Sequence, residues 1–182
     1  MIAAVSLVVL VALALLLVLL YNRLVRLRNR AENSWAQVDV QLRRRYDLVP
    51  NLVETVKAYA AHERATLEEV TRARTAAQEA QTVPEQAAAE NVLTAAIGRL
   101  FALVEQYPEL RASEGFRQLQ AQLEDTEGKI AVARQIYNDT VLEYDTALES
   151  VPTNVVASLF GFRPRAYFEI DERSREAPRV AF

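Results

Sequence analysis

Few residues in this chain of 182 can carry out chemistry. The absence of cysteine removes a thiol nucleophile, a thiolate metal site and a disulfide framework. The single histidine, His62, is followed by Glu63. A phosphoacceptor histidine would need a kinase domain, for which no Gly-rich nucleotide motif or length is present, and a di-iron bundle site needs two Glu-x-x-His motifs. We therefore expect no enzyme activity, no cofactor and no metal.

The densest group of polar side chains surrounds Pro50. Proline has no backbone N–H, so it leaves a carbonyl near Tyr46 without its helical donor, and an arginine or asparagine side chain is able to supply one. We predict that a polar cluster here clamps the helices in register, with a ligand or partner site as the alternative. The predicted cluster consists of Arg44, Arg45, Asp47, Asn51, Arg134 and Asn138.

The elements that position these residues begin with an apolar segment, Ile2 to Leu20. It contains one serine and no charge, and its 19 residues, if helical, span about 29 Å, close to the hydrocarbon thickness of a bilayer. A cleaved signal peptide is the main alternative, but no positive residue precedes the segment and no small-x-small cleavage site follows it. We predict an uncleaved transmembrane anchor over residues 1–21.

Positive charge gathers directly after the apolar segment. Seven arginines and two acidic residues lie between Tyr21 and Tyr46, although the whole chain has a net charge of −3. The four arginines nearest the segment form a basic collar, which we expect to contact an anionic membrane surface. The collar consists of Arg23, Arg26, Arg28 and Arg30. The positive-inside rule places the N-terminus outside the cell membrane and the rest of the chain in the cytoplasm. The lipid bilayer is thus a predicted partner, and nucleic acid is not.

Helical periodicity continues beyond the membrane segment. From Leu24, apolar residues recur every three or four positions, and this phase survives through Pro50. We predict one long helix from the membrane to about Gln81, bent near Pro50. A full break, with Asp47 capping a new helix, is the alternative.

Further helices follow. Pro84 is placed to open the second, and Pro108 to close it. The apolar face of this second helix is expected to include Val92, Ala96, Leu100, Leu103 and Tyr107. Ser113 is placed to cap a third over 114 to about 149, followed by a short piece capped by Asn154. The apolar seam of the third helix repeats every seven residues, as in a bundle or coiled coil. The seam consists of Phe116, Leu123, Ile130, Tyr137, Tyr144 and Val151.

These elements predict an all-α protein. The transmembrane helix continues into an antiparallel bundle of three to four long helices over 22–160, which ends in a short helix, and an extended tail covers 161–182. The aromatic residues predicted for the core are Trp35, Tyr59, Tyr107, Phe116, Tyr137 and Tyr144. The apolar residues of the tail are Phe162, Tyr167, Phe168, Ile170, Val180 and Phe182. We expect the tail to pack back on the bundle, with docking on another subunit or partner as the alternative.

Several stretches match a known family in order along the chain. They are WAQVD at 35–39, RRYDLVPNL at 44–52, YPELRASE at 107–114, IAVARQIYN at 130–138 and FGF at 160–162. They resemble the LemA family of bacterial membrane proteins. The resemblance implies a membrane helix followed by an antiparallel helical bundle, with no settled biochemical role. Gly115 and Gly128 depart from the family pattern, which often has asparagine at these positions.

Two functions fit these features. The first is a non-enzymatic membrane scaffold, a homo-oligomer that self-associates or organises partners at the membrane surface. The second is a membrane-tethered binding or signalling adaptor that presents the bundle surface or the tail to a soluble partner. The protein partner itself is unknown in either case.

Overall fold

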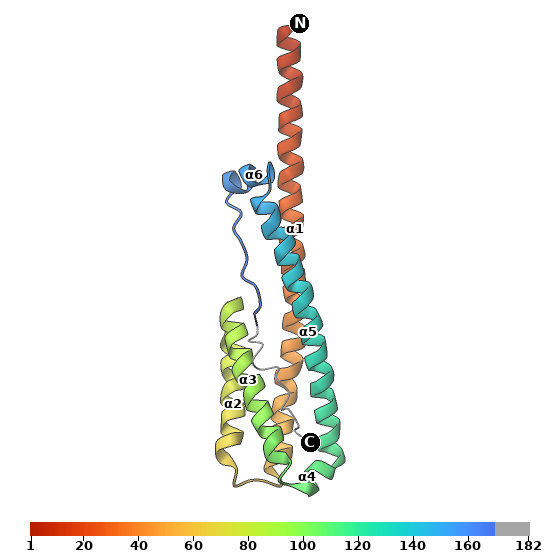
Figure 1. The fold of residues 1–182 in the computed structure, drawn as a ribbon, viewed down its shortest axis with the longest axis vertical. Coiled ribbons are helices and arrows are strands. Elements are labelled where there is room, and N and C mark those ends of the chain that lie inside the picture. Colours follow the sequence, from red (N-terminus) through yellow and green to blue (C-terminus); the bar gives the residue numbers. More distant parts are fainter. Residues whose placement is uncertain (170–182) are drawn as a thin grey trace, which may run out of the picture.

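The long helix α1 is the axis of the molecule. In the computed structural model it runs without interruption from Ile2 to Lys57, 56 residues that extend about 84 Å. Its apolar first part projects alone beyond all the other helices (Figure 1), and every residue from Ile2 to Leu19 is exposed. A helix that is apolar on all faces and has no protein cover fits a lipid environment.

The structure describes residues 1–169. Its elements are α1 (Ile2–Lys57), α2 (Arg64–Glu79), α3 (Val83–Val104), α4 (Pro108–Ala112), α5 (Glu114–Glu149) and α6 (Thr153–Phe160). Among the described residues only α1 and α3 are long and apolar enough to cross a membrane, and 44% of the apolar window of α3 is buried inside the bundle. The predicted all-α class, with a long apolar helix leading into packed helices, is confirmed.

Helices α1 and α5 lie side by side and run in opposite directions (Figure 1). The ion pairs between them show the antiparallel register, because Arg30 pairs with Glu143 at 2.7 Å and Arg44 with Asp125 at 3.6 Å. The heptad seam of α5 is buried from Phe116 to Tyr144, as its spacing predicts. Val151 is the exception, since it lies beyond the end of α5 and is exposed.

Helices α2 and α3 form a hairpin against the lower part of α1 (Figure 1). The turn between them ends in a capping box, in which Thr82 accepts a hydrogen bond from the Glu85 N–H and the Glu85 carboxylate accepts one from the Thr82 N–H. Pro84 lies in the first turn of α3, where its missing N–H is harmless. The predicted start of this helix is therefore confirmed.

The predicted continuation of α1 to Gln81 is wrong. The helix ends at Lys57, and the chain reverses before α2 begins at Arg64. The turn contains no glycine or proline, and apolar spacing continues across it because Ala60 points into the core and is fully buried. The periodicity therefore looked continuous although the backbone direction changed. The prediction that α1 passes through Pro50 is confirmed.

Four smaller expectations also need correction. Tyr59 is exposed and does not belong to the core, because it lies in the turn after α1. Val92 is exposed, and the buried face of α3 runs through Leu93 and Leu100. Pro108 opens the short helix α4, and Asn154 lies inside α6 where it caps nothing.

The described part of the tail packs back on the bundle. Phe168 is fully buried, and its ring lies 5.4 Å from that of Trp35 in an edge-to-face arrangement. The Tyr137 hydroxyl donates to the Ala166 carbonyl at 2.8 Å, and the Tyr144 hydroxyl to the Arg163 carbonyl at 3.1 Å. Ile170, Val180 and Phe182 lie outside the described residues.

Candidate functional site

A buried arginine holds three helices together. Arg45 of α1 is 2% exposed, and its Nη1 lies 2.9 Å from Glu90 Oε2 on α3. Its Nη2 reaches Glu127 Oε1 on α5 at 2.8 Å and donates to the Thr94 hydroxyl at 2.9 Å. A charge buried this deeply needs such partners, because leaving it unpaired would be very costly. These contacts connect α1 to both α3 and α5.

The partner carboxylate of Glu90 is itself fully buried and fully engaged. The Tyr46 hydroxyl donates to Glu90 Oε1, and Gln86 Nε2 donates to the same oxygen at 3.2 Å. Burial raises the pKa of the Glu90 carboxyl, while the Arg45 charge and these two hydrogen bonds oppose that rise. Burial and the Glu90 charge raise the pKa of the Tyr46 phenol, which therefore stays a donor. The network reaches the surface at Glu127, whose side chain is 44% exposed, and at Tyr46 and Gln86, which line an open pocket.

A side chain of α2 supplies the hydrogen bond that the α1 backbone lacks at Pro50. Because Pro50 has no N–H, the Tyr46 carbonyl lacks its helical donor, and Arg74 Nε donates to it at 2.7 Å. The sequence predicts an arginine or asparagine donor for this carbonyl, and an arginine supplies it. Which arginine was not foreseeable, because Arg74 reaches this point only through the chain reversal before α2.

The six residues of the predicted polar cluster do not all meet. Arg45 lies in the buried network, and Arg44 pairs with Asp125 at the edge of α5. Asp47 and Asn51 are exposed. Asn138 holds the tail, since its Oδ1 accepts from the Phe168 N–H at 2.9 Å and its Nδ2 donates to the Phe168 carbonyl at 3.3 Å.

Arg134, the sixth residue, is half-buried on α5. Glu90, Glu127 and Arg74 were missed by the sequence analysis, because isolated acidic and basic residues on helices usually face solvent. That the cluster acts as a clamp stays a prediction.

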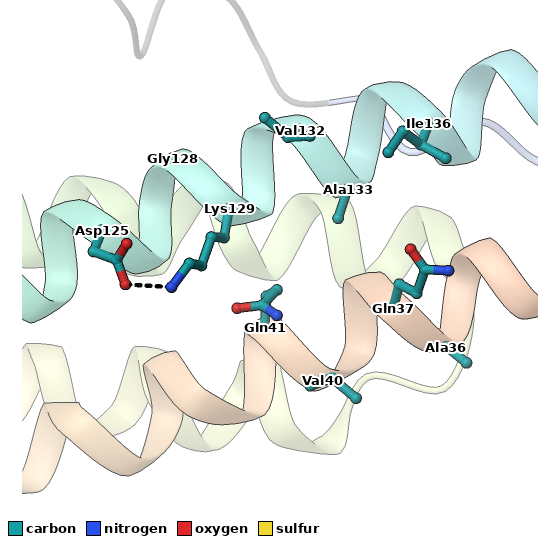
Figure 2. Close-up of a pocket in the computed structure, with 10 residues that line it drawn as sticks. All are labelled: Ala36, Gln37, Val40, Gln41, Asp125, Gly128, Lys129, Val132, Ala133 and Ile136. Atoms are coloured by element: carbon teal, nitrogen blue, oxygen red, sulfur yellow. Dashed lines mark hydrogen bonds and ion pairs between the residues drawn. The ribbon is translucent and has the colours of Figure 1, made fainter.

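A second feature, also missed, is an open groove between the outer faces of α1 and α5. Its volume is about 820 Å³. Figure 2 shows Gln37 and Gln41 projecting from α1 into the space between the helices, with Val132 on the facing helix. The lining residues are Ala36, Gln37, Val40, Gln41, Asp125, Gly128, Lys129, Val132, Ala133 and Ile136. Most are small, aliphatic or amide side chains, which suits packing against another helix better than catalysis.

The groove has two features of an unfilled contact surface. Val40 and Val132 are each 61% exposed, and Ile136 is also exposed. Gln41 Oε1 is buried in the wall of the groove and has no hydrogen-bond partner among the described residues. The only charges lining it, Asp125 and Lys129, neutralise each other at 2.7 Å.

The basic collar occupies about two turns of α1 directly after the apolar part. All four of its arginines, Arg23, Arg26, Arg28 and Arg30, are exposed. Arg28 lies over the ring of Phe162, 5.6 Å from its centroid, and Arg30 pairs with Glu143. In the part of the chain that the structure describes, no three His, Asp or Glu residues are grouped to hold a metal ion.

Comparison of the sequence with known proteins identifies the family of this chain. The model of the LemA family matches residues 34–182. The chain belongs to the LemA family. Its relatives include the magnetosome protein MamQ of Magnetospirillum gryphiswaldense, which is 27% identical over 191 aligned positions. The match covers 91% of this chain and 70% of that relative.

Two further relatives are the magnetosome proteins MamQ 1 and MamQ 2 of Paramagnetospirillum magneticum. Each is 26% identical to the chain, with the same coverage of 91% and 70%. Together with the uncovered apolar helix, membership of the LemA family indicates a membrane-associated helical protein.

Proposed function

We propose that this LemA protein is a single-pass, non-enzymatic membrane scaffold that associates with itself and organises partners at the membrane surface. The observation that carries the proposal is the uninterrupted helix α1. Residues 2–19 are all exposed, and the same helix then forms the central helix of the bundle. A flexible tether would need no such continuity, whereas a scaffold gains a fixed position over the bilayer from it.

The basic collar supports an orientation for this scaffold. Exposed arginines at Arg23 and Arg26 follow the apolar part immediately, and no charged side chain precedes it. Positive residues beside a membrane helix favour the cytoplasmic side, where the surface is anionic. We place the N-terminus outside and the bundle in the cytoplasm.

Orientation can be tested because the chain has no native cysteine. A single-cysteine variant, Val92→Cys, places a thiol on an exposed face of α3. In intact spheroplasts a membrane-impermeant maleimide should leave this thiol unmodified until the cells are lysed. Modification before lysis would place the bundle outside and overturn the proposed orientation.

The groove between α1 and α5 supports self-association. Membrane-anchored copies stand parallel, so a two-fold axis along α1 brings the same level of each groove together. All of the lining residues lie within one short interval of each helix, 36–41 on α1 and 125–136 on α5, and the patch is neutral. Two such faces can therefore meet without like-charge repulsion, and a second copy is able to offer a donor to Gln41.

Light scattering of the full chain in a mild detergent tests self-association. We expect a defined homo-oligomer, and Val132→Glu should reduce its mass by placing a charge in the contact. Val92→Glu is the matched control, because Val92 is 55% exposed against 61% for Val132 but lies on α3, away from the groove. A monomeric wild-type chain, or equal effects of the two substitutions, would rule out self-association through the groove.

The adaptor function rests on the same groove with a different occupant. An apolar groove between two helices can accept an amphipathic helix of a soluble protein. The described part of the tail is not available for this role, because Phe168 is fully buried in the same chain. A monomer whose groove variant loses a crosslinked partner, while Val92→Glu keeps it, would favour the adaptor.

A further inference from the structure

Helix α6 lies at the end of the bundle where the bare part of α1 begins (Figure 1). Two contacts show that α6 lies beside the end of the apolar segment of α1. The Phe160 ring is 4.9 Å from the ring of Tyr21, and Leu20, the last residue of the apolar segment, packs against the small core beneath α6. This small core consists of Leu24, Leu27, Tyr144, Ala147, Val156 and Ala157. Helix α6 is thus attached to α1 where the apolar segment ends.

One face of α6 is used by this small core, and another is bare. Val156 and Ala157 are buried against it. Val155 and Leu159, one helical turn apart, are 55% and 70% exposed, and Val151 and Phe160 beside them are exposed as well. An eight-residue helix with apolar residues on both its buried and its exposed sides exposes an apolar surface, which marks a site of contact with a membrane or another protein.

The distribution of charge around α6 also fits a membrane interface. The stretch 150–162 contains no charged side chain, and Arg163 follows directly. Arg23 and Arg26 of the collar are exposed just beyond Tyr21 on α1. Apolar and aromatic side chains at one level, with arginines immediately below, reproduce the profile of a membrane interface, where tyrosine lies at the headgroups and arginine extends into them.

We propose that α6 is a second membrane contact, an interfacial helix whose Val155–Leu159 face enters the boundary between headgroups and acyl chains. This inference rests on the proposed membrane span of α1. Interfacial helices of this kind bury their apolar face about 5–10 Å into the bilayer. Helix α6 packs against Tyr21 and against the end of α5. Its insertion therefore brings this end of the bundle into contact with the membrane.

The occupant of this face is lipid and not a second protein because of where the face lies. It adjoins the helix that we place in the bilayer, and its Phe160 already contacts Tyr21 at the end of that helix. A soluble partner docking there would have to displace the lipid headgroups around the collar. The consequence is a fixed rotation of the bundle, since α1 alone leaves the molecule free to turn about its axis.

The absence of native cysteine allows a direct test with single nitroxide labels. The full chain is reconstituted into vesicles of phosphatidylcholine and phosphatidylglycerol, with a label at Val155→Cys or Leu159→Cys. Leu10→Cys in the bare part of α1 is the reference for lipid, and Val92→Cys on α3 is the reference for water. Collision of each label with oxygen, which prefers lipid, and with a water-soluble nickel chelate is then measured.

We expect the labels at 155 and 159 to lie between the two references, with fewer nickel collisions than at 92, more than at 10, and retained oxygen collisions. Nickel collisions equal to those at 92 would show that α6 lies in water, and shielding from both reagents would show that protein covers it. Either result overturns the proposal while Leu10→Cys still reports a membrane span. If the label at 10 is itself open to nickel, the span fails and the interfacial contact fails with it.

Discussion

The two parts of α1 have the same backbone and opposite surroundings. From Ile2 to Leu19 every residue is exposed and none is charged. From Leu24 to Val56 one face is continuously buried by α5, α2 and α6, and that face includes the charged Arg45. The helix does not break between the two parts, so secondary structure does not separate them.

The difference shows what determines where a charge is tolerated in a helix. The bundle part can bury Arg45 because Glu90, Glu127 and Thr94 are supplied by other helices. The apolar part has no protein partners to supply, so it carries no charge at all. Substitutions in the bundle part should therefore change folding, whereas substitutions in the apolar part should change only membrane insertion.

Breaking the buried ion pair should have the largest effect. Arg45→Met leaves Glu90 buried without its cation, which should lower the free energy of unfolding by about 3–5 kcal/mol. Arg99→Met is the control, because it breaks the largely exposed Arg99–Glu69 pair and should cost about 1 kcal/mol or less. Urea denaturation followed by circular dichroism in the same detergent compares them. Equal costs would mean that the buried network adds no stability of its own.

A charge in the apolar part should leave the fold intact and weaken insertion. Leu10→Arg places a guanidinium near the middle of the proposed span, which should cost about 3 kcal/mol of insertion free energy. Flotation of membranes should show less protein in the lipid fraction, with unchanged thermal unfolding of the bundle. Val92→Arg should float like the wild type, and a loss of bundle structure in Leu10→Arg would contradict the division of α1 into two parts.

Removing the donor that repairs the helix at Pro50 should have an intermediate effect. Arg74→Met leaves the Tyr46 carbonyl without a hydrogen bond and should cost about 1–3 kcal/mol. Pro50→Ala restores a backbone N–H four residues after that carbonyl, so the cost of Arg74→Met should shrink in this background. A double-mutant cycle of unfolding free energies measures the coupling, and an unchanged cost would show that Arg74 acts elsewhere.

The smallest expected effect is a change in alkaline stability. Burial raises the pKa of the Tyr46 phenol above its ordinary value of 10.0. Below pH 10 the phenol is protonated in both states, and its contribution to stability is complete. Above pH 10 the unfolded chain ionises while the folded one does not, so stability falls by up to about 1.4 kcal/mol per pH unit for each such tyrosine.

Tyr46→Phe should make the unfolding free energy fall less steeply between pH 10 and 11. Part of the slope should remain, because burial also raises the pKa values of Tyr137 and Tyr144. An unchanged slope would show that the Tyr46 phenol ionises equally easily in the folded and unfolded states.

The fold was largely predictable from periodicity, and its exceptions have physical reasons. The heptad seam from Phe116 to Tyr144 and the capping by Ser113 appear as expected. The reversal after Lys57 was not predictable, because Ala60 keeps the apolar phase through the turn. Proline at position 50 indicated that a carbonyl needed a donor, but only the tertiary structure could choose Arg74. The groove was hidden as well, since Val40 and Val132 lie outside the apolar phase of their helices and single apolar residues are common on protein surfaces.

We infer that α1 carries the bundle rigidly from the bilayer. It is tested most directly by the distance between nitroxides at Val18→Cys and Val40→Cys in reconstituted vesicles, with labelled chains diluted in unlabelled ones. Both side chains are exposed, and 22 residues of continuous helix separate their backbones by about 33 Å. We predict a single narrow distance distribution centred near that separation. A broad distribution, or one centred at clearly shorter distances, would reveal a hinge at the membrane surface and show that α1 does not hold the bundle rigidly.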